Sequence, residues 1–108
     1  MPTKQDAIIK VNAFVQELLQ SGVSLDKVIL FGSYSNGTQT KDSDIDVVLV
    51  SSMFNGFGFE DRKLFSRINI KNEFLDIETK TYPTNYFING DPFITEILKT
   101  GIELHSTY

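Results

Sequence analysis

The chain has 108 residues, of which 41% are hydrophobic and 22% charged, and its formal net charge is -4. This length supports one domain with one modest core, and the composition is that of a globular protein rather than a disordered one. The acidic balance excludes broad electrostatic binding to nucleic acid, because that mode needs clustered Lys and Arg and the ten basic residues are interpreted as scattered.

Cysteine is absent, which excludes disulfides and thiolate metal sites. Any metal must therefore bind to oxygen ligands or to the single histidine. No stretch approaches the roughly 18 apolar residues that a membrane span requires, and the N-terminus lacks the basic-then-apolar order of a signal peptide. We expect a cytoplasmic protein that makes no membrane contact.

The first predicted element is an amphipathic helix. Thr3 and Asp6 resemble a capping box at its start, apolar residues recur at helical spacing, and the pattern ends at Ser21 and Gly22. A buried strand is expected over residues 25–31, because this segment is apolar and rich in β-branched residues and then stops at a glycine.

The middle of the chain contains a loop, a strand and a helix. Turn-forming residues fill segment 34–43, and a second apolar strand is expected over 45–50. A Gly- and Phe-rich connection then leads into a helix predicted over about residues 60–68. The charged run 61–63 is interpreted as the solvent face of this helix.

A third strand is predicted over residues 74–82, where apolar and polar side chains alternate and the polar face carries Asp76 and Glu78. Asp91, followed by a proline, is a favourable cap for a short helix that ends at Gly101. The tail beyond it is compatible with a short edge strand. This order of elements predicts a small α+β domain with a mixed β-sheet and helices packed mainly on one face.

The segment that points to chemistry is FGSYSNGTQTKDSDID, residues 31–46. Gly32 and Ser33 directly follow the first strand, where glycine permits a tight turn that brings backbone N–H groups close to a ligand such as phosphate. Asp44 and Asp46 come ten residues after Ser33 at the start of the second strand. Because alternate residues of a strand point to one face, the two carboxylates project together.

Two neighbouring carboxylates repel each other unless solvent or a cation neutralises them. Hard oxygen ligands suit Mg²⁺ or Mn²⁺, and in two-metal phosphoryl transfer the ions lie roughly 3.5–4 Å apart and clamp the attacking and leaving oxygens. A third carboxylate on a neighbouring strand would complete such a site. Asp76, with an apolar residue on either side, is the better candidate, and Glu78 shares its face as a second one.

The spacing GS, ten residues and then DxD resembles the signature of the minimal nucleotidyltransferase family, in the polymerase-beta-like nucleotidyltransferase superfamily. It is similar in particular to MntA-type antitoxins encoded beside HEPN-domain toxins. The resemblance covers essentially the whole chain. It implies that Gly32 and Ser33 contact ATP, that Asp44 and Asp46 hold two Mg²⁺ ions, and that Asp76 ligates metal and helps to deprotonate the acceptor.

One departure from the family pattern lies after GS, where many members carry an arginine. The corresponding residues 34–37 are Tyr, Ser, Asn and Gly. Stabilisation of the triphosphate is therefore expected to fall to Lys41, to backbone donors and to metal.

The leading interpretation is a single nucleotidyltransferase domain over residues 1–108 that moves a nucleoside monophosphate, AMP before any other, to a hydroxyl of a protein such as a HEPN toxin. The alternative is a binding module that neutralises its partner by complex formation. The intact DxD favours the enzyme, and the missing arginine favours the module. The sequence does not decide between a homo-oligomer and a hetero-oligomer. The aromatic segments around Phe57 and Tyr86 are candidate docking surfaces.

Transfer to a small molecule such as an aminoglycoside is the third interpretation. It is disfavoured because nothing in the chain could form a dedicated drug-binding domain, although a homodimer could build such a cleft between subunits.

Overall fold

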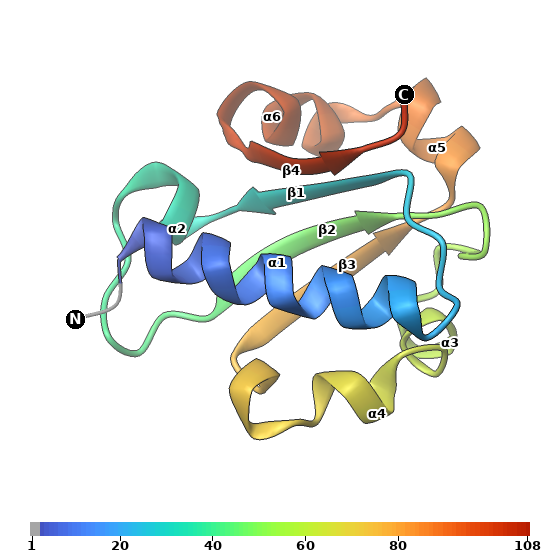
Figure 1. Ribbon diagram of the computed structural model, residues 1–108. Helices are drawn as coiled ribbons and strands as arrows, with labels where there is room; N and C mark the ends of the chain where they lie inside the picture. The colour runs from blue at the N-terminus through green and yellow to red at the C-terminus, as the bar shows by residue number, and fades with distance from the viewer. Residues whose placement is uncertain (1–2) are drawn as a thin grey trace.

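The computed structural model describes residues 3–108, and its centre is a four-stranded mixed sheet with helices on both faces (Figure 1). In spatial order the strands are β3 (Ile77–Tyr82), β2 (Ile45–Val50), β1 (Lys27–Phe31) and β4 (Ile102–Ser106). Strand β2 is antiparallel to β1 and parallel to β3, and β4 is antiparallel to β1. The α+β class and the mixed sheet are thus confirmed.

The described residues also form six helices and one 3-10 turn, of which α1 precedes the first strand and the others lie between strands. They are α1 (Lys4–Gln20), α2 (Ser33–Asn36), α3 (Gly58–Arg62), α4 (Ser66–Asn69), the 3-10 turn η1 (Asn72–Phe74), α5 (Thr84–Asn89) and α6 (Pro92–Thr100). The capping box of Thr3 and Asp6 is present at the start of α1, and the Asp91 side chain accepts a hydrogen bond from the Ile94 N–H at the start of α6. Of the residues described, no helix could cross a membrane.

From Val47 to Val50, strand β2 is buried on both faces, which explains the apolar run VVLV. Val47 and Leu49 belong to the larger core, which α1 covers (Figure 1). Val48 and Val50 belong to a smaller core on the opposite face, where α5 and α6 contribute Phe87, Ile94 and Ile97. Asp46, near the start of β2, lies on the same face of the sheet as this smaller core.

The helix expected over residues 60–68 is broken into α3 and α4. Phe65 interrupts it with a φ of -140°, and its ring packs near the rings of Phe14 and Phe54 in the larger core. Two further helices, α2 and α5, were not predicted from the sequence. They have four and six residues, which is too short for a helical period to be recognised.

Asp61 is buried, so its interpretation as part of a solvent-exposed run is wrong, whereas its two basic neighbours are exposed. Its carboxylate accepts hydrogen bonds from the N–H groups of Asn55 (2.9 Å) and Gly56 (3.0 Å) and from the hydroxyl of Thr81 (2.7 Å). These three bonds join α3 and the loop before it to β3. Burial of this carboxylate is tolerated because each bond replaces one made by water.

Replacing Asp61 by Ala should lower the free energy of unfolding by about 2–4 kcal/mol, because it removes three hydrogen bonds to a charged group and leaves their donors unpaired. Urea unfolding followed by circular dichroism measures this loss. Glu60→Ala is the matched control: this neighbouring carboxylate is exposed, and a change within about 0.5 kcal/mol is expected. Equal effects of the two substitutions would contradict a structural role for Asp61.

Candidate active site

The GS turn and the DxD motif meet because β1 and β2 pair in antiparallel register. Phe31, the last residue of β1, lies opposite Asp46. The next residue, Gly32, has a φ of 75° and a ψ of -150°, a conformation that is strained for residues with a side chain. A Cβ atom built on Gly32 would lie 2.3 Å from an oxygen of the Asp46 carboxylate. This glycine therefore makes room for the carboxylate.

Helix α2 begins directly after Gly32 and fixes the direction of the turn. The Gly32 carbonyl accepts the N–H groups of Ser35 (3.1 Å) and Asn36 (3.0 Å), and Tyr34 is buried in the larger core. Ser33 is half-buried at the first helical position. The first N–H groups of a helix have no carbonyl partner within it and can bind an anion.

Three carboxylates gather at this end of the sheet. Asp46 is half-buried, Asp44 precedes it on the exposed approach to β2, and Glu78 on β3 lies opposite Asp46 in the parallel register. Burial raises the pKa of Asp46, and the negative charges of Asp44 and Glu78 raise it further. The three groups therefore interact electrostatically on one face of the sheet.

Asp76 lies just before β3, and its side chain is engaged elsewhere. Its carboxylate pairs with the Lys10 ammonium of α1 at 2.9 Å, and its backbone carbonyl accepts the N–H of Ile45 at 2.8 Å. Burial, followed by the charge of Asp76, raises the pKa of Tyr34 on this side. Asp76 is thus close to Asp46 along the strand direction, but its side chain points to α1.

Two lysines are candidates for the missing cation. Lys41 is exposed in the loop before the DxD motif. Lys80 was not singled out in the sequence, although it shares strand parity with Glu78 and therefore lies on the same face, about 7 Å further along β3. Its ammonium lies 5.6 Å from the ring centroid of Tyr82 and 5.1 Å from that of Phe93.

The donors present fit divalent metal ions by chemistry. Carboxylate oxygens are the ligands that Mg²⁺ prefers. Burial, and after it the negative charges of Asp44 and Glu78, raise the pKa of Asp46, and a cation would neutralise those charges. The side chains of residues 3–108 do not form a ready-made group of three Asp, Glu, His or Cys ligands.

Gly32→Ala should destabilise the fold more than Gly37→Ala. Both glycines have a positive φ, but a Cβ at Gly37 would meet nothing within 4 Å. We expect Gly37→Ala to lose about 1–2 kcal/mol from backbone strain alone. Gly32→Ala also displaces the Asp46 carboxylate. Chemical denaturation of both variants measures the difference, and equal losses would show that the contact with Asp46 is unimportant.

Asp46→Asn should raise the free energy of unfolding at neutral pH in the absence of divalent metal. The folded-state pKa of Asp46 exceeds its unfolded value, so ionisation of this group weakens the folded state as pH rises through the folded pKa. The advantage of the variant should disappear below about pH 4, near the ordinary Asp pKa, where the wild-type group is protonated. Urea titrations at pH 7 and pH 3.5 test this; a gap that does not depend on pH would contradict it.

Comparison with known proteins supports one family. The nucleotidyltransferase domain model matches residues 8–104. The putative protein adenylyltransferase MJ0141 of Methanocaldococcus jannaschii is 33% identical over 85 residues, which cover 74% of this chain and 79% of that protein.

Solved structures share the fold. A putative nucleotidyltransferase from Sulfolobus solfataricus has a TM-score of 0.67 at 18% identity and matches 96% of this chain and 84% of its own. A toxin–antitoxin structure with AMP-PNP has a TM-score of 0.56 at 23% identity, covering 88% of this chain and 73% of its own. A mutant of the toxin–antitoxin MntA-HpeT has a TM-score of 0.56 at 21% identity, with coverages of 89% and 73%. With the family model matching nearly its whole length, this chain belongs to the nucleotidyltransferase domain family.

Proposed function

We propose that this chain is a metal-dependent adenylyltransferase that moves AMP from ATP to a hydroxyl of a partner protein. The observation that carries the proposal is the contact between the Asp46 carboxylate and the side-chain-free Gly32, with Ser33 next to it. This contact places Asp46, a residue type that binds metal ions, next to a glycine turn of the kind that binds phosphate. The name of the Methanocaldococcus relative supports protein adenylylation, and the AMP-PNP structure supports an adenine nucleotide.

Asp44 and Asp46 are the residues that would hold Mg²⁺, together with Glu78 or Asp76. The bound ions would supply charge neutralisation and polarisation of the phosphate oxygens. The register favours Glu78 as the third carboxylate because it lies opposite Asp46, whereas Asp76 is paired with Lys10. The role of Asp76 remains a prediction, and it would require the ion pair to open.

The proposed transfer is a displacement at the α-phosphorus of ATP. The acceptor oxygen forms a bond to the α-phosphorus of ATP, the bond from that phosphorus to the bridging oxygen breaks, and pyrophosphate leaves with the bonding electron pair. The third carboxylate receives the hydroxyl proton. Such a general base contributes about 10²–10⁴-fold to the rate.

Ser33 and the backbone N–H groups at the start of α2 are proposed to bind the triphosphate. Lys80 is a candidate for the cation that the missing arginine would provide, because it lies on the same face of the sheet as Asp46 and Glu78. Lys41, exposed in the loop before the DxD motif, is the other candidate. The rings of Phe31 and Phe93, 5.7 Å apart in an edge-to-face pair, border this face.

The second candidate function is a binding module that neutralises a partner without catalysis. Phe57 and Phe59 favour it, because both are 70% exposed beside the sheet and such apolar surface is typical of protein contacts. A HEPN-type toxin is the proposed partner in either case, supported by the toxin–antitoxin structures that share the fold.

We expect Mg²⁺-dependent ATP binding and transfer of AMP to the protein encoded beside this chain. Titration calorimetry with and without Mg²⁺ measures binding, and intact-mass spectrometry of the partner measures transfer. Asp46→Asn should abolish the mass increase while the variant stays folded. Equal ATP affinity with and without Mg²⁺ would contradict the metal role, and a stable complex without any mass increase would favour the binding module.

A pair of conservative variants identifies the third carboxylate in the same assay. Glu78→Gln should reduce the transfer rate at least about 100-fold without changing ATP affinity, as expected for loss of a base. Asp76→Asn should leave most transfer intact, because this carboxylate already neutralises Lys10. The reverse pattern would assign the role to Asp76.

A further inference from the structure

The sheet face that carries Asp46 continues into an aromatic surface. Phe31 lies directly opposite Asp46 in the antiparallel register and packs against the smaller core on this face. Side chains that are directly opposite in antiparallel strands have their Cβ atoms about 4.5–5.5 Å apart. The Phe31 ring contacts the Phe93 ring at the start of α6, with 5.7 Å between the two centroids and an angle of 89° between the ring planes. Only Phe31 therefore separates Phe93 from the acid proposed to bind metal.

Phe93 is exposed although it is large and hydrophobic. Its side chain is 41% exposed, whereas Ile94 and Ile97 of the same helix are buried in the smaller core. The ring thus covers Phe31 and also presents apolar surface to solvent. A flat heterocycle that stacks on such a ring removes apolar surface from water, and it does so whichever base it is.

The ammonium of Lys80 rests on this aromatic surface. It lies 5.1 Å from the ring centroid of Phe93 and 5.6 Å from that of Tyr82. Lys80 is exposed, and a cation–π contact at an exposed position is weaker than the stacking of a base on an aromatic ring. A base could therefore replace the ammonium on the Phe93 ring. The ammonium would then be free to pair with phosphate oxygens.

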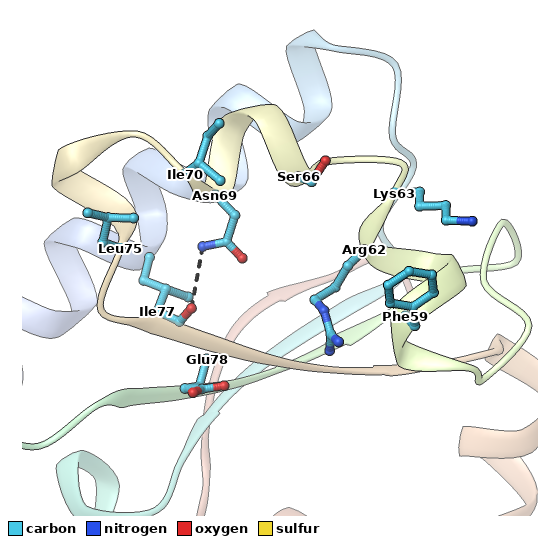
Figure 2. Close-up of a pocket in the computed structure, with 9 residues that line it drawn as sticks. All are labelled: Phe59, Arg62, Lys63, Ser66, Asn69, Ile70, Leu75, Ile77 and Glu78. Atoms are coloured by element: carbon cyan, nitrogen blue, oxygen red, sulfur yellow. Dashed lines mark hydrogen bonds between the residues drawn. The ribbon is translucent and has the colours of Figure 1, made fainter.

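A cavity of about 520 Å³ at the outer edge of β3 is the alternative place for a base. Figure 2 shows its walls: α3 and the start of α4 on one side, and the chain from Leu75 to Glu78 on the other. Ile77 in this wall belongs to the larger core, which lies on the sheet face opposite to Asp46. A base bound there would have to pass around the edge strand, whereas Phe93 is reached along the Asp46 face.

We propose that Phe93 is the residue on which the base of the bound nucleotide stacks. The assignment rests on the proposed function, which places the triphosphate at Ser33 and the metal ions at Asp46. One ribose separates the α-phosphate from the base, and Phe93 offers an exposed aromatic ring on the same side of the sheet. Because every base has a flat aromatic face, this contact contributes to the affinity for nucleotides without selecting adenine over guanine.

The first test compares the Mg²⁺ complexes of ATP and of an abasic ribose triphosphate, which has the same sugar and phosphates but no base. Titration calorimetry of the wild type should show ATP binding at least about tenfold more tightly. Phe93→Leu keeps an apolar side chain but removes the ring, so most of this difference should disappear while the affinity for the abasic compound is unchanged. Phe93→Tyr keeps the ring and should keep the difference.

A fluorescent nucleotide provides a readout of stacking itself. The emission of aminopurine riboside triphosphate is quenched when its base stacks on an aromatic ring. Binding to the wild type and to Phe93→Tyr should quench this emission, and binding to Phe93→Leu should not. Circular dichroism checks that each variant is folded at the temperature of the measurement.

The matched control is Phe59→Leu, the same substitution at a phenylalanine in the wall of the β3 cavity that is 70% exposed. It should bind both compounds like the wild type. Loss of the ATP preference in Phe59→Leu but not in Phe93→Leu would assign the base to the cavity and overturn the inference. Equal affinity of the wild type for ATP and for the abasic compound would overturn it as well.

The binding measurements and the transfer assay separate this inference from the proposed function. An ATP preference that depends on Phe93 supports base stacking even if no AMP is transferred, in which case the proposed catalysis fails. Transfer of AMP together with an ATP preference that Phe93→Leu leaves unchanged supports the catalysis and overturns the stacking. Failure of the wild type to bind either compound would contradict both.

Discussion

The arrangement of this site depends on the missing side chain of Gly32, because the Asp46 carboxylate occupies the space that a Cβ atom would take. The antiparallel pairing of β1 and β2 would direct any side chain at this position into the Asp46 carboxylate, 2.3 Å from the Cβ position. With no side chain there, the chain can turn at once into α2 and place Ser33 beside the acid. The smaller core holds the two strands together through Ile29 and Val48, which lie opposite each other. The GS turn, proposed to bind phosphate, and Asp46, proposed to bind metal, are in this way parts of one packing contact.

Local features of the fold could be predicted from the sequence because their causes lie within a few residues. The capping box of Thr3 and Asp6 depends on residues three apart, and the cap formed by Asp91 does too. The common face of the DxD pair follows from strand parity alone. Strand β2 was predicted with its observed bounds because its run VVLV is apolar and buried on both faces and because turn-forming residues precede Ile45.

Features that depend on partners far apart in the sequence could not be predicted. Which acid on β3 lies opposite Asp46 depends on the parallel register, and Glu78, not Asp76, occupies that position. The attachment of Asp76 to α1 by Lys10 gives no local pattern, since 66 residues separate the two. Asp61 stands between residues typical of a solvated helix face, and only its distant partner Thr81 reveals that it is buried.

The two outer strands of the sheet also determine how this chain can associate with others. The side-chain amide of Asn69 donates hydrogen bonds to the carbonyls of Phe74 and Ile77 along the β3 edge. At the other end, the pairing of β1 and β4 shifts register between Val28 and Ile29, which twists the edge strand. Covered and twisted edges are known to oppose the addition of further strands. Both features disfavour aggregation by edge-to-edge pairing.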